Sequence, residues 1–123
     1  MKEKILIVDS NISILNLLEF LLTQANFTPI KCHTGKNAIE LCKNEPEIKL
    51  CFMEEKLPDV PSVDTLKEML KISPKLPVIL ISGSNFENSQ KVSYSNGAYG
   101  IIYKPFDAEE ILSITNQILR KKT

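Results

Sequence analysis

The chain has 123 residues, a length that fits one domain burying about two-thirds of the surface its unfolded form would expose. Basic and acidic residues number 15 each, so the net charge is zero and no general attraction to nucleic acid or membranes is expected. No apolar run reaches the ~20 residues of a membrane helix, and no signal peptide precedes the first strand. We therefore expect a cytoplasmic protein, with its three cysteines acting as small core side chains.

Continuous apolar segments alternate with amphipathic ones along the chain. This alternation is typical of an α/β fold in which helices cover both faces of a parallel sheet. Five strands are predicted, at Lys4 to Asp9, Thr28 to Cys32, Ile48 to Glu54, Pro77 to Ser82 and Tyr99 to Tyr103.

Helical periodicity fills the intervals between these strands. From Asn11 to Ala25, apolar residues recur every three or four positions, which predicts a mostly buried first helix. In the last helix Asp107, followed by Glu110, is expected to form a capping box. The second to fifth helices are predicted at Gly35 to Asn44, Ser62 to Ile72, Ser84 to Ser95 and Ala108 to Lys122. The fourth of the five is weakened by its serine and asparagine residues.

Five short motifs coincide with these strands or lie directly beside them in the sequence. They are Ile5 to Asp9, Ile48 to Glu54 with Lys56-Leu57-Pro58 following, Val78 to Ser82, Gly97-Ala98 and Lys104-Pro105-Phe106. Together they resemble the receiver domain of bacterial response regulators over nearly the whole chain. The resemblance implies a single domain over residues 1–123, with a flavodoxin-like (βα)5 sheet of strand order 2-1-3-4-5.

The resemblance also implies a phosphorylation site, which this sequence alters. In the family an aspartate at the position of Glu54 accepts a phosphoryl group from a histidine kinase. Two acids after the first strand help it to hold Mg²⁺, and here Asp9 matches the first while Ser10 replaces the second. Ser82 matches a hydroxyl that binds the phosphoryl group, and Lys104 matches a lysine that does the same.

The altered charges predict a pocket with weak or absent Mg²⁺ binding and no other cofactor. A hydroxyl is a poor substitute for a carboxylate on this hard cation, so only Asp9 and Glu54 remain as metal ligands. We expect Lys104 to pair directly with Glu54, and Lys56, turned inward, to complete neutrality. Because glutamate carries its carboxylate one methylene further out, phosphorylation should be impaired, and the domain is interpreted as a pseudo-receiver without enzymatic activity.

The position that often holds the family's switch aromatic is Ile101 in this chain, with Tyr99 and Tyr103 on either side. Strand alternation places all three on one face. Because an aliphatic Ile101 has no phenol to move between two positions, we expect the family's usual switch to be absent or rebuilt through Tyr103 and the fourth helix. The resemblance implies a protein partner, such as a histidine kinase or an output protein, on the face formed by the fourth helix, fifth strand and fifth helix. A monomer or weak homodimer is expected.

Two alternatives remain open at this point. In the first, the chain is an ordinary phosphoacceptor receiver that is phosphorylated on Glu54 or on the neighbouring Glu55. In the second, it is a flavodoxin-like flavin binder that uses Ser10, Asn11 and Ser13 as phosphate ligands. The first loop has no glycine and carries an aspartate, which disfavours the flavin alternative.

Overall fold

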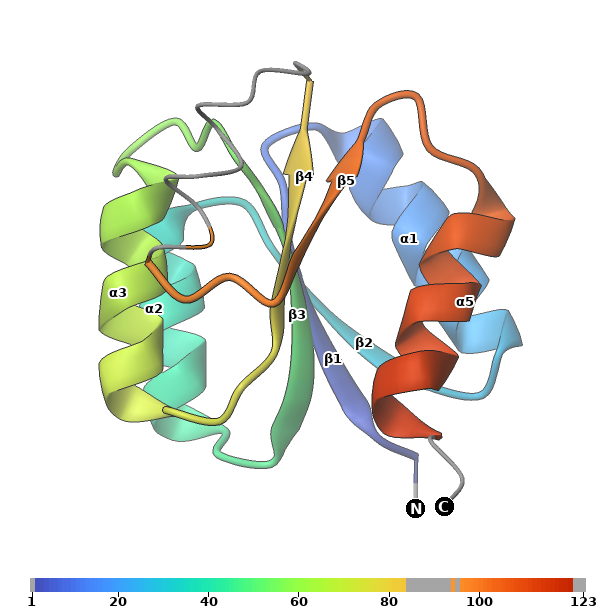
Figure 1. Cartoon of the computed structure of the whole chain (residues 1–123), viewed down its shortest axis with the longest axis horizontal. Coiled ribbons are helices and arrows are strands. Elements are labelled where there is room, and N and C mark those ends of the chain that lie inside the picture. Colours follow the sequence, from blue (N-terminus) through green and yellow to red (C-terminus); the bar gives the residue numbers. More distant parts are fainter. Residues whose placement is uncertain (1, 84–93, 95, 121–123) are drawn as a thin grey trace.

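A computed structural model of the chain describes residues 2–83, 94 and 96–120. Parallel strands form one five-stranded sheet in the order β2-β1-β3-β4-β5, which confirms the predicted topology (Figure 1). The central strands are buried on both faces, which explains their continuous apolar sequences. The strands are β1 (Lys4–Val8), β2 (Thr28–Cys32), β3 (Ile48–Glu54), β4 (Val78–Ser82) and β5 (Gly100–Tyr103).

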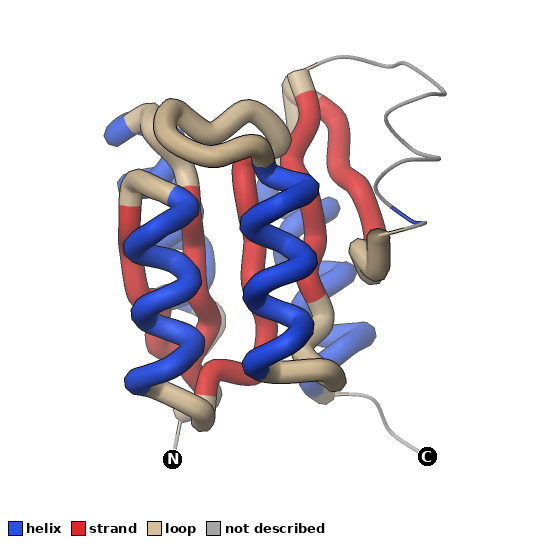
Figure 2. The backbone as a smooth tube through the Cα atoms, turned by 90° about the vertical axis from the view of Figure 1, so that its left-hand side faces the viewer, coloured by secondary structure: helices blue, strands red, loops and turns tan. Residues whose placement is uncertain are grey.

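The helices form a layer on each face of this sheet. Helices α1 and α5 lie on one side, and α2 and α3 lie together on the other, where they are in front of the strands in Figure 2. This doubly wound arrangement confirms the predicted fold class. The helices within the described part are α1 (Ile12–Gln24), α2 (Gly35–Asn44), α3 (Ser62–Ile72) and α5 (Ala108–Leu119).

Polar side chains fix where three of these helices begin. The Asn11 side chain accepts hydrogen bonds from two backbone N–H groups of α1, and Thr34 accepts one from α2. At α5 Asp107 and Glu110 form the predicted capping box, because each side chain accepts a hydrogen bond from the other residue's backbone N–H. Each cap satisfies donors that the first helical turn leaves without partners.

The sheet separates two hydrophobic clusters. Along β1, Leu6 and Val8 contribute to the cluster under α2 and α3, whereas Ile5 and Ile7 contribute to the one under α1 and α5. This alternation follows from the two-residue repeat of a strand. The three free cysteines are buried in the first cluster, as expected for small core side chains.

Small differences separate the predicted and observed strand ends. β1 ends at Val8 and leaves Asp9 in the loop, because the chain must turn there for α1 to begin. β4 begins at Val78, and the carbonyl of Pro77 still accepts a hydrogen bond from β3. The fourth predicted helix, Ser84 to Ser95, falls almost entirely outside the described residues, and after it Gly97 has a φ of 101°. None of the described helices is long and apolar enough to span a membrane.

Candidate functional site

The residues predicted to carry function lie at the carboxyl edge of the sheet. All five strands run in the same direction, so the loops after β1, β3, β4 and β5 meet at this edge, which is uppermost in Figure 1. Asp9 and Ser10 follow β1, Glu54 ends β3, Ser82 ends β4, and Lys104 follows β5. Such an edge is where doubly wound α/β folds bind their ligands.

Asp9 is a buried acid with one unsatisfied oxygen. Asp9 is 1% exposed, and its Oδ1 accepts a hydrogen bond of 2.8 Å from the Asn11 N–H, whereas its Oδ2 has no hydrogen-bond partner among the described residues. Burial raises the pKa of the Asp9 carboxyl from 3.8 to about 6. The Asn11 N–H opposes this rise in pKa, the neighbouring Glu54 carboxylate adds to it, and the positive charge of Lys104 opposes it. Asp9 therefore gains a proton more readily than an exposed aspartate does.

Ser10 binds the Glu54 carboxylate directly. The Ser10 hydroxyl donates to Glu54 Oε1 over 2.8 Å, and the Ser10 backbone N–H donates to the same oxygen over 3.3 Å. A second acid at position 10 would instead repel Glu54. The serine thus turns the Glu54 carboxylate toward β1 and supplies it with neutral hydrogen-bond donors.

Glu55 makes a contact that the sequence analysis did not predict. The buried Ser82 hydroxyl donates a hydrogen bond of 2.7 Å to Glu55 Oε1. The backbone N–H of Glu55 also donates to the carbonyl of Ile81 over 2.9 Å. Two adjacent acids at the end of β3 therefore bind opposite neighbours, Glu54 toward β1 and Glu55 toward β4. The pair of acids and the alternation of an extended chain are the signals that could have suggested this contact.

The expected ion pair between Lys104 and Glu54 is not formed. Within the described ranges, no basic nitrogen lies within 4.0 Å of the Glu54 carboxylate, and Lys56 is exposed rather than turned inward. Both lysines nevertheless line a pocket of about 230 Å³ that also contains the two acids. Because Ser10 and Ser82 already satisfy the acids, neither carboxylate needs a lysine as a hydrogen-bond donor.

These side chains fit a magnesium ion poorly. Among residues 2–83, 94 and 96–120, no group of three or more His, Cys, Asp or Glu side chains is arranged to hold a metal ion. Asp9 offers one free oxygen, but the Glu54 oxygen that faces Ser10 already accepts two hydrogen bonds. Mg²⁺ demands near-octahedral oxygen coordination, and the serine contributes only a neutral hydroxyl.

The two positions predicted to matter for signalling share one face of β5. Gly100 and Ile102 are buried, whereas Ile101 and Tyr103 alternate with them and are half-buried. Ile101 packs against the hydrophobic cluster under α2 and α3, and Tyr103 is the register partner of Ser82 on β4. The strand thus connects the pocket edge with an aliphatic side chain that packs against the core.

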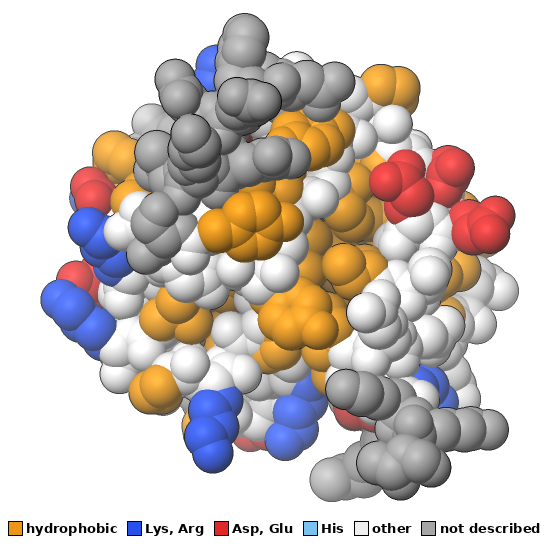
Figure 3. Space-filling model, viewed as in Figure 1, with side chains coloured by type: hydrophobic (Ala, Val, Ile, Leu, Met, Phe, Trp, Pro, Cys, Tyr) orange, Lys and Arg blue, Asp and Glu red, His pale blue; other side chains and the backbone are white. Residues whose placement is uncertain are grey.

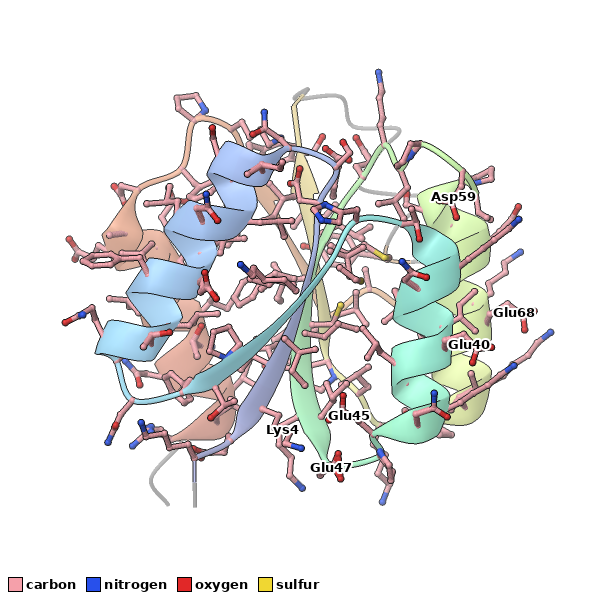
Figure 4. All side chains as sticks on the ribbon, turned by 180° about the vertical axis from the view of Figure 1, so that it is seen from behind. Lys4, Glu40, Glu45, Glu47, Asp59 and Glu68 are labelled. Atoms are coloured by element: carbon pink, nitrogen blue, oxygen red, sulfur yellow. The ribbon has the colours of Figure 1, made fainter. Side chains whose placement is uncertain are left out.

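Asp59 is a further residue that the sequence analysis missed. Its carboxylate accepts hydrogen bonds from the backbone N–H groups of Gly35, at 2.9 Å, and Lys36, at 3.1 Å. These bonds lower the pKa of Asp59 below its ordinary value. Figure 4 shows Asp59 beside the first turns of α2 and α3. The loop after Glu54 is therefore fastened to the start of α2.

Comparison with known proteins agrees with this arrangement. The sequence matches the family described as the response regulator receiver domain over residues 5–116. It is 31% identical to the regulatory protein VanR of Enterococcus faecium over 98% of this chain and 52% of that protein. It is 30% identical to the transcriptional regulatory protein CpxR of Escherichia coli over 96% of this chain and 50% of that protein. The chain thus spans about half the length of these curated relatives.

A solved structure shows the same fold. The receiver domain protein (CheY-like) from Methanospirillum hungatei superimposes with a TM-score of 0.92 at 24% identity, covering 98% of this chain and 96% of that one. The family match decides against the flavodoxin-like flavin binder considered above. From its sequence match and its parallel sheet, the chain belongs to the response regulator receiver domain family.

Proposed function

We propose that this receiver domain is impaired in phosphorylation and signals through protein contacts without enzymatic activity. The observation that carries the proposal is the 2.8 Å hydrogen bond from the Ser10 hydroxyl to Glu54. Ser10 occupies the position of a metal-binding acid, and Glu54 occupies the position of the phosphoacceptor. A single contact therefore engages both altered residues with each other.

Two effects act together against transfer of a phosphoryl group. The extra methylene displaces the Glu54 carboxylate by about one carbon–carbon bond, ~1.5 Å. A misplacement of ~1 Å costs on the order of a hundredfold in rate when a reaction depends on positioning. The poor fit to Mg²⁺ adds a second loss, because the metal would neutralise the charge of the incoming group.

We further propose that the partner binds over β5 and α5 and the segment before β5. Figure 3 shows apolar side chains gathered over β5, between α3 and α5. Tyr94, in the segment before β5, is 49% exposed, and Tyr99, which directly precedes β5, is 52% exposed. Exposed tyrosines are common anchors in protein interfaces. A histidine kinase or an output protein in the cytoplasm is the expected partner, and the free domain is expected to be a monomer or weak homodimer.

Intact mass after incubation with acetyl phosphate and Mg²⁺ tests the loss of phosphorylation. The parent protein should keep its mass, whereas the double variant Ser10→Asp with Glu54→Asp should gain one phosphoryl group. The double variant is the matched control, because it restores both family residues in the same fold.

A mass gain by the parent would overturn the proposal and favour an ordinary phosphoacceptor receiver. Glu54→Gln and Glu55→Gln would then show which glutamate accepts the group. An inert double variant would contradict the assignment of Ser10 and Glu54 to the family positions.

A further inference from the structure

The side chain of Glu55 ties β3 to the end of β4. Its carboxylate accepts the 2.7 Å hydrogen bond from the Ser82 hydroxyl, and the Ser82 side chain is fully buried. The backbone N–H of Glu55 donates to the carbonyl of Ile81 at the same end of β4. Two hydrogen bonds from one residue thus fix where this strand ends relative to the loop after β3.

Ser82 in turn is bonded to β5. Its carbonyl accepts a hydrogen bond of 2.8 Å from the Lys104 backbone N–H, and Ser82 pairs with Tyr103 in the register of the two strands. A continuous path of hydrogen bonds therefore runs from Glu55 through Ser82 to Lys104. It crosses the carboxyl ends of three neighbouring strands.

The pocket beside this path is charge-balanced. Its lining includes Glu54 and Glu55 as well as Lys56 and Lys104, so the formal charges of these four residues cancel. A carboxylate oxygen accepts a charge-assisted hydrogen bond from a hydroxyl, as an oxygen of an external anion such as phosphate also can. The chain thus supplies, from Glu55, an anionic group to the Ser82 hydroxyl.

We infer that Glu55 is a built-in ligand of the pocket and holds the ends of β4 and β5 in one arrangement whether or not a phosphodonor is present. The inference rests on the proposed function, and it names Glu55 as the residue that would keep the ends of β4 and β5 permanently in this one arrangement. Glu54 is not this ligand, because its carboxylate is bound on the other side, to Ser10.

Phosphate binding tests the inference with a matched control. Glu55→Ala and Glu54→Ala each change the formal charge of the pocket lining by +1, but only the first removes the carboxylate that accepts the hydrogen bond from the Ser82 hydroxyl. In an NMR titration with inorganic phosphate, Glu55→Ala should show shifts at Ser82, Gly83 and Lys104. Glu54→Ala and the parent should bind phosphate at least about tenfold more weakly than Glu55→Ala does, because about tenfold corresponds to one hydrogen bond to a charged group. Equal binding by the two variants would mean that charge alone governs the pocket and would overturn the inference.

Amide hydrogen exchange gives a second readout without any ligand. The Lys104 amide donates to the Ser82 carbonyl, so its exchange should accelerate on the order of tenfold in Glu55→Ala relative to the parent. Exchange at Leu6 in the core serves as the reference for global stability. Glu55→Gln, which keeps an acceptor oxygen, should lie between the parent and the alanine variant.

Unchanged exchange at Lys104 in Glu55→Ala, with Leu6 also unchanged, would contradict the inference. The intact-mass assay described above is independent of this measurement. A parent that stays unphosphorylated while Glu55→Ala leaves β5 unaffected would refute the built-in ligand and leave the proposed loss of phosphorylation standing. Phosphorylation of the parent would refute the proposed function itself.

Discussion

Replacing Asp9 with asparagine should make the stability of the domain less dependent on pH. Asp9 is 1% exposed, and burial raises its folded-state pKa from 3.8 to about 6. Between these two pH values the folded state binds more protons than the unfolded state, so stability falls as pH rises. The contribution of Asp9 is therefore fully present below about pH 4 and is lost as the pH passes through about 6.

The size of this loss follows from the difference between the two pKa values. Each unit of difference corresponds to about 1.4 kcal/mol, so the parent should lose about 3 kcal/mol between pH 4 and pH 8 through Asp9. Asparagine stays neutral throughout this range. Its carbonyl oxygen can accept from the Asn11 N–H as Asp9 Oδ1 does, and its amide can donate toward Glu54.

Urea unfolding of the parent and of Asp9→Asn at several pH values, in the presence of a chelator, measures the effect. The free energies of unfolding should be similar near pH 4 and should diverge with rising pH, with the variant more stable at pH 8. Asp64→Asn, which changes an exposed acid in the first turn of α3, is the control. Parallel curves for the parent and Asp9→Asn would show that Asp9 is solvated in solution and would refute the reasoning.

Three further predictions concern Lys104, Ser10 and Asp107. Lys104→Ala should lower the free energy of unfolding by less than about 1 kcal/mol, because no ion pair to Glu54 is lost; a larger fall in urea unfolding would show that the pair forms in solution. Mg²⁺, titrated by NMR, should bind with a dissociation constant of about 1 mM or weaker, and Ser10→Asp should tighten it; tight binding by the parent would show that its two carboxylates suffice. Asp107→Ala should cost about 0.5–2 kcal/mol by thermal or urea unfolding, since it removes the capping box of α5, and an unchanged midpoint would mean that the cap contributes nothing.

The helices and strands could be predicted because their sequence signals are local, whereas the strand order was implied by the resemblance to receiver domains. Apolar strands such as Ile48–Glu54 and the cap formed by Asp107 with Glu110 depend on residues close together in the chain. The parallel sheet then brings every strand end to one edge, so that Asp9 and Glu54 were expected to be neighbours. This expectation used the direction of the parallel strands together with the strand order implied by the resemblance.

Side-chain partners within the site were harder to predict. Charge counting favoured a pair between Lys104 and Glu54, but a serine hydroxyl lies closer to each acid and satisfies it without ordering a long lysine side chain. Asp59 was missed for a similar reason, because its partners on α2 lie more than twenty residues earlier in the chain. Such choices depend on the packed positions of several loops, which sequence spacing does not determine.

The loop after β3 is anchored to the helix layer formed by α2 and α3. Asp59 fastens this loop to α2, and α2 lies so close to α3 that a Cβ atom on Gly35 would stand 2.5 Å from Thr65 Oγ1. The loop, α2 and α3 should consequently move as one block. Any rearrangement that begins in the pocket would then travel outward along β4 and β5, toward Tyr99 and the apolar surface of Figure 3.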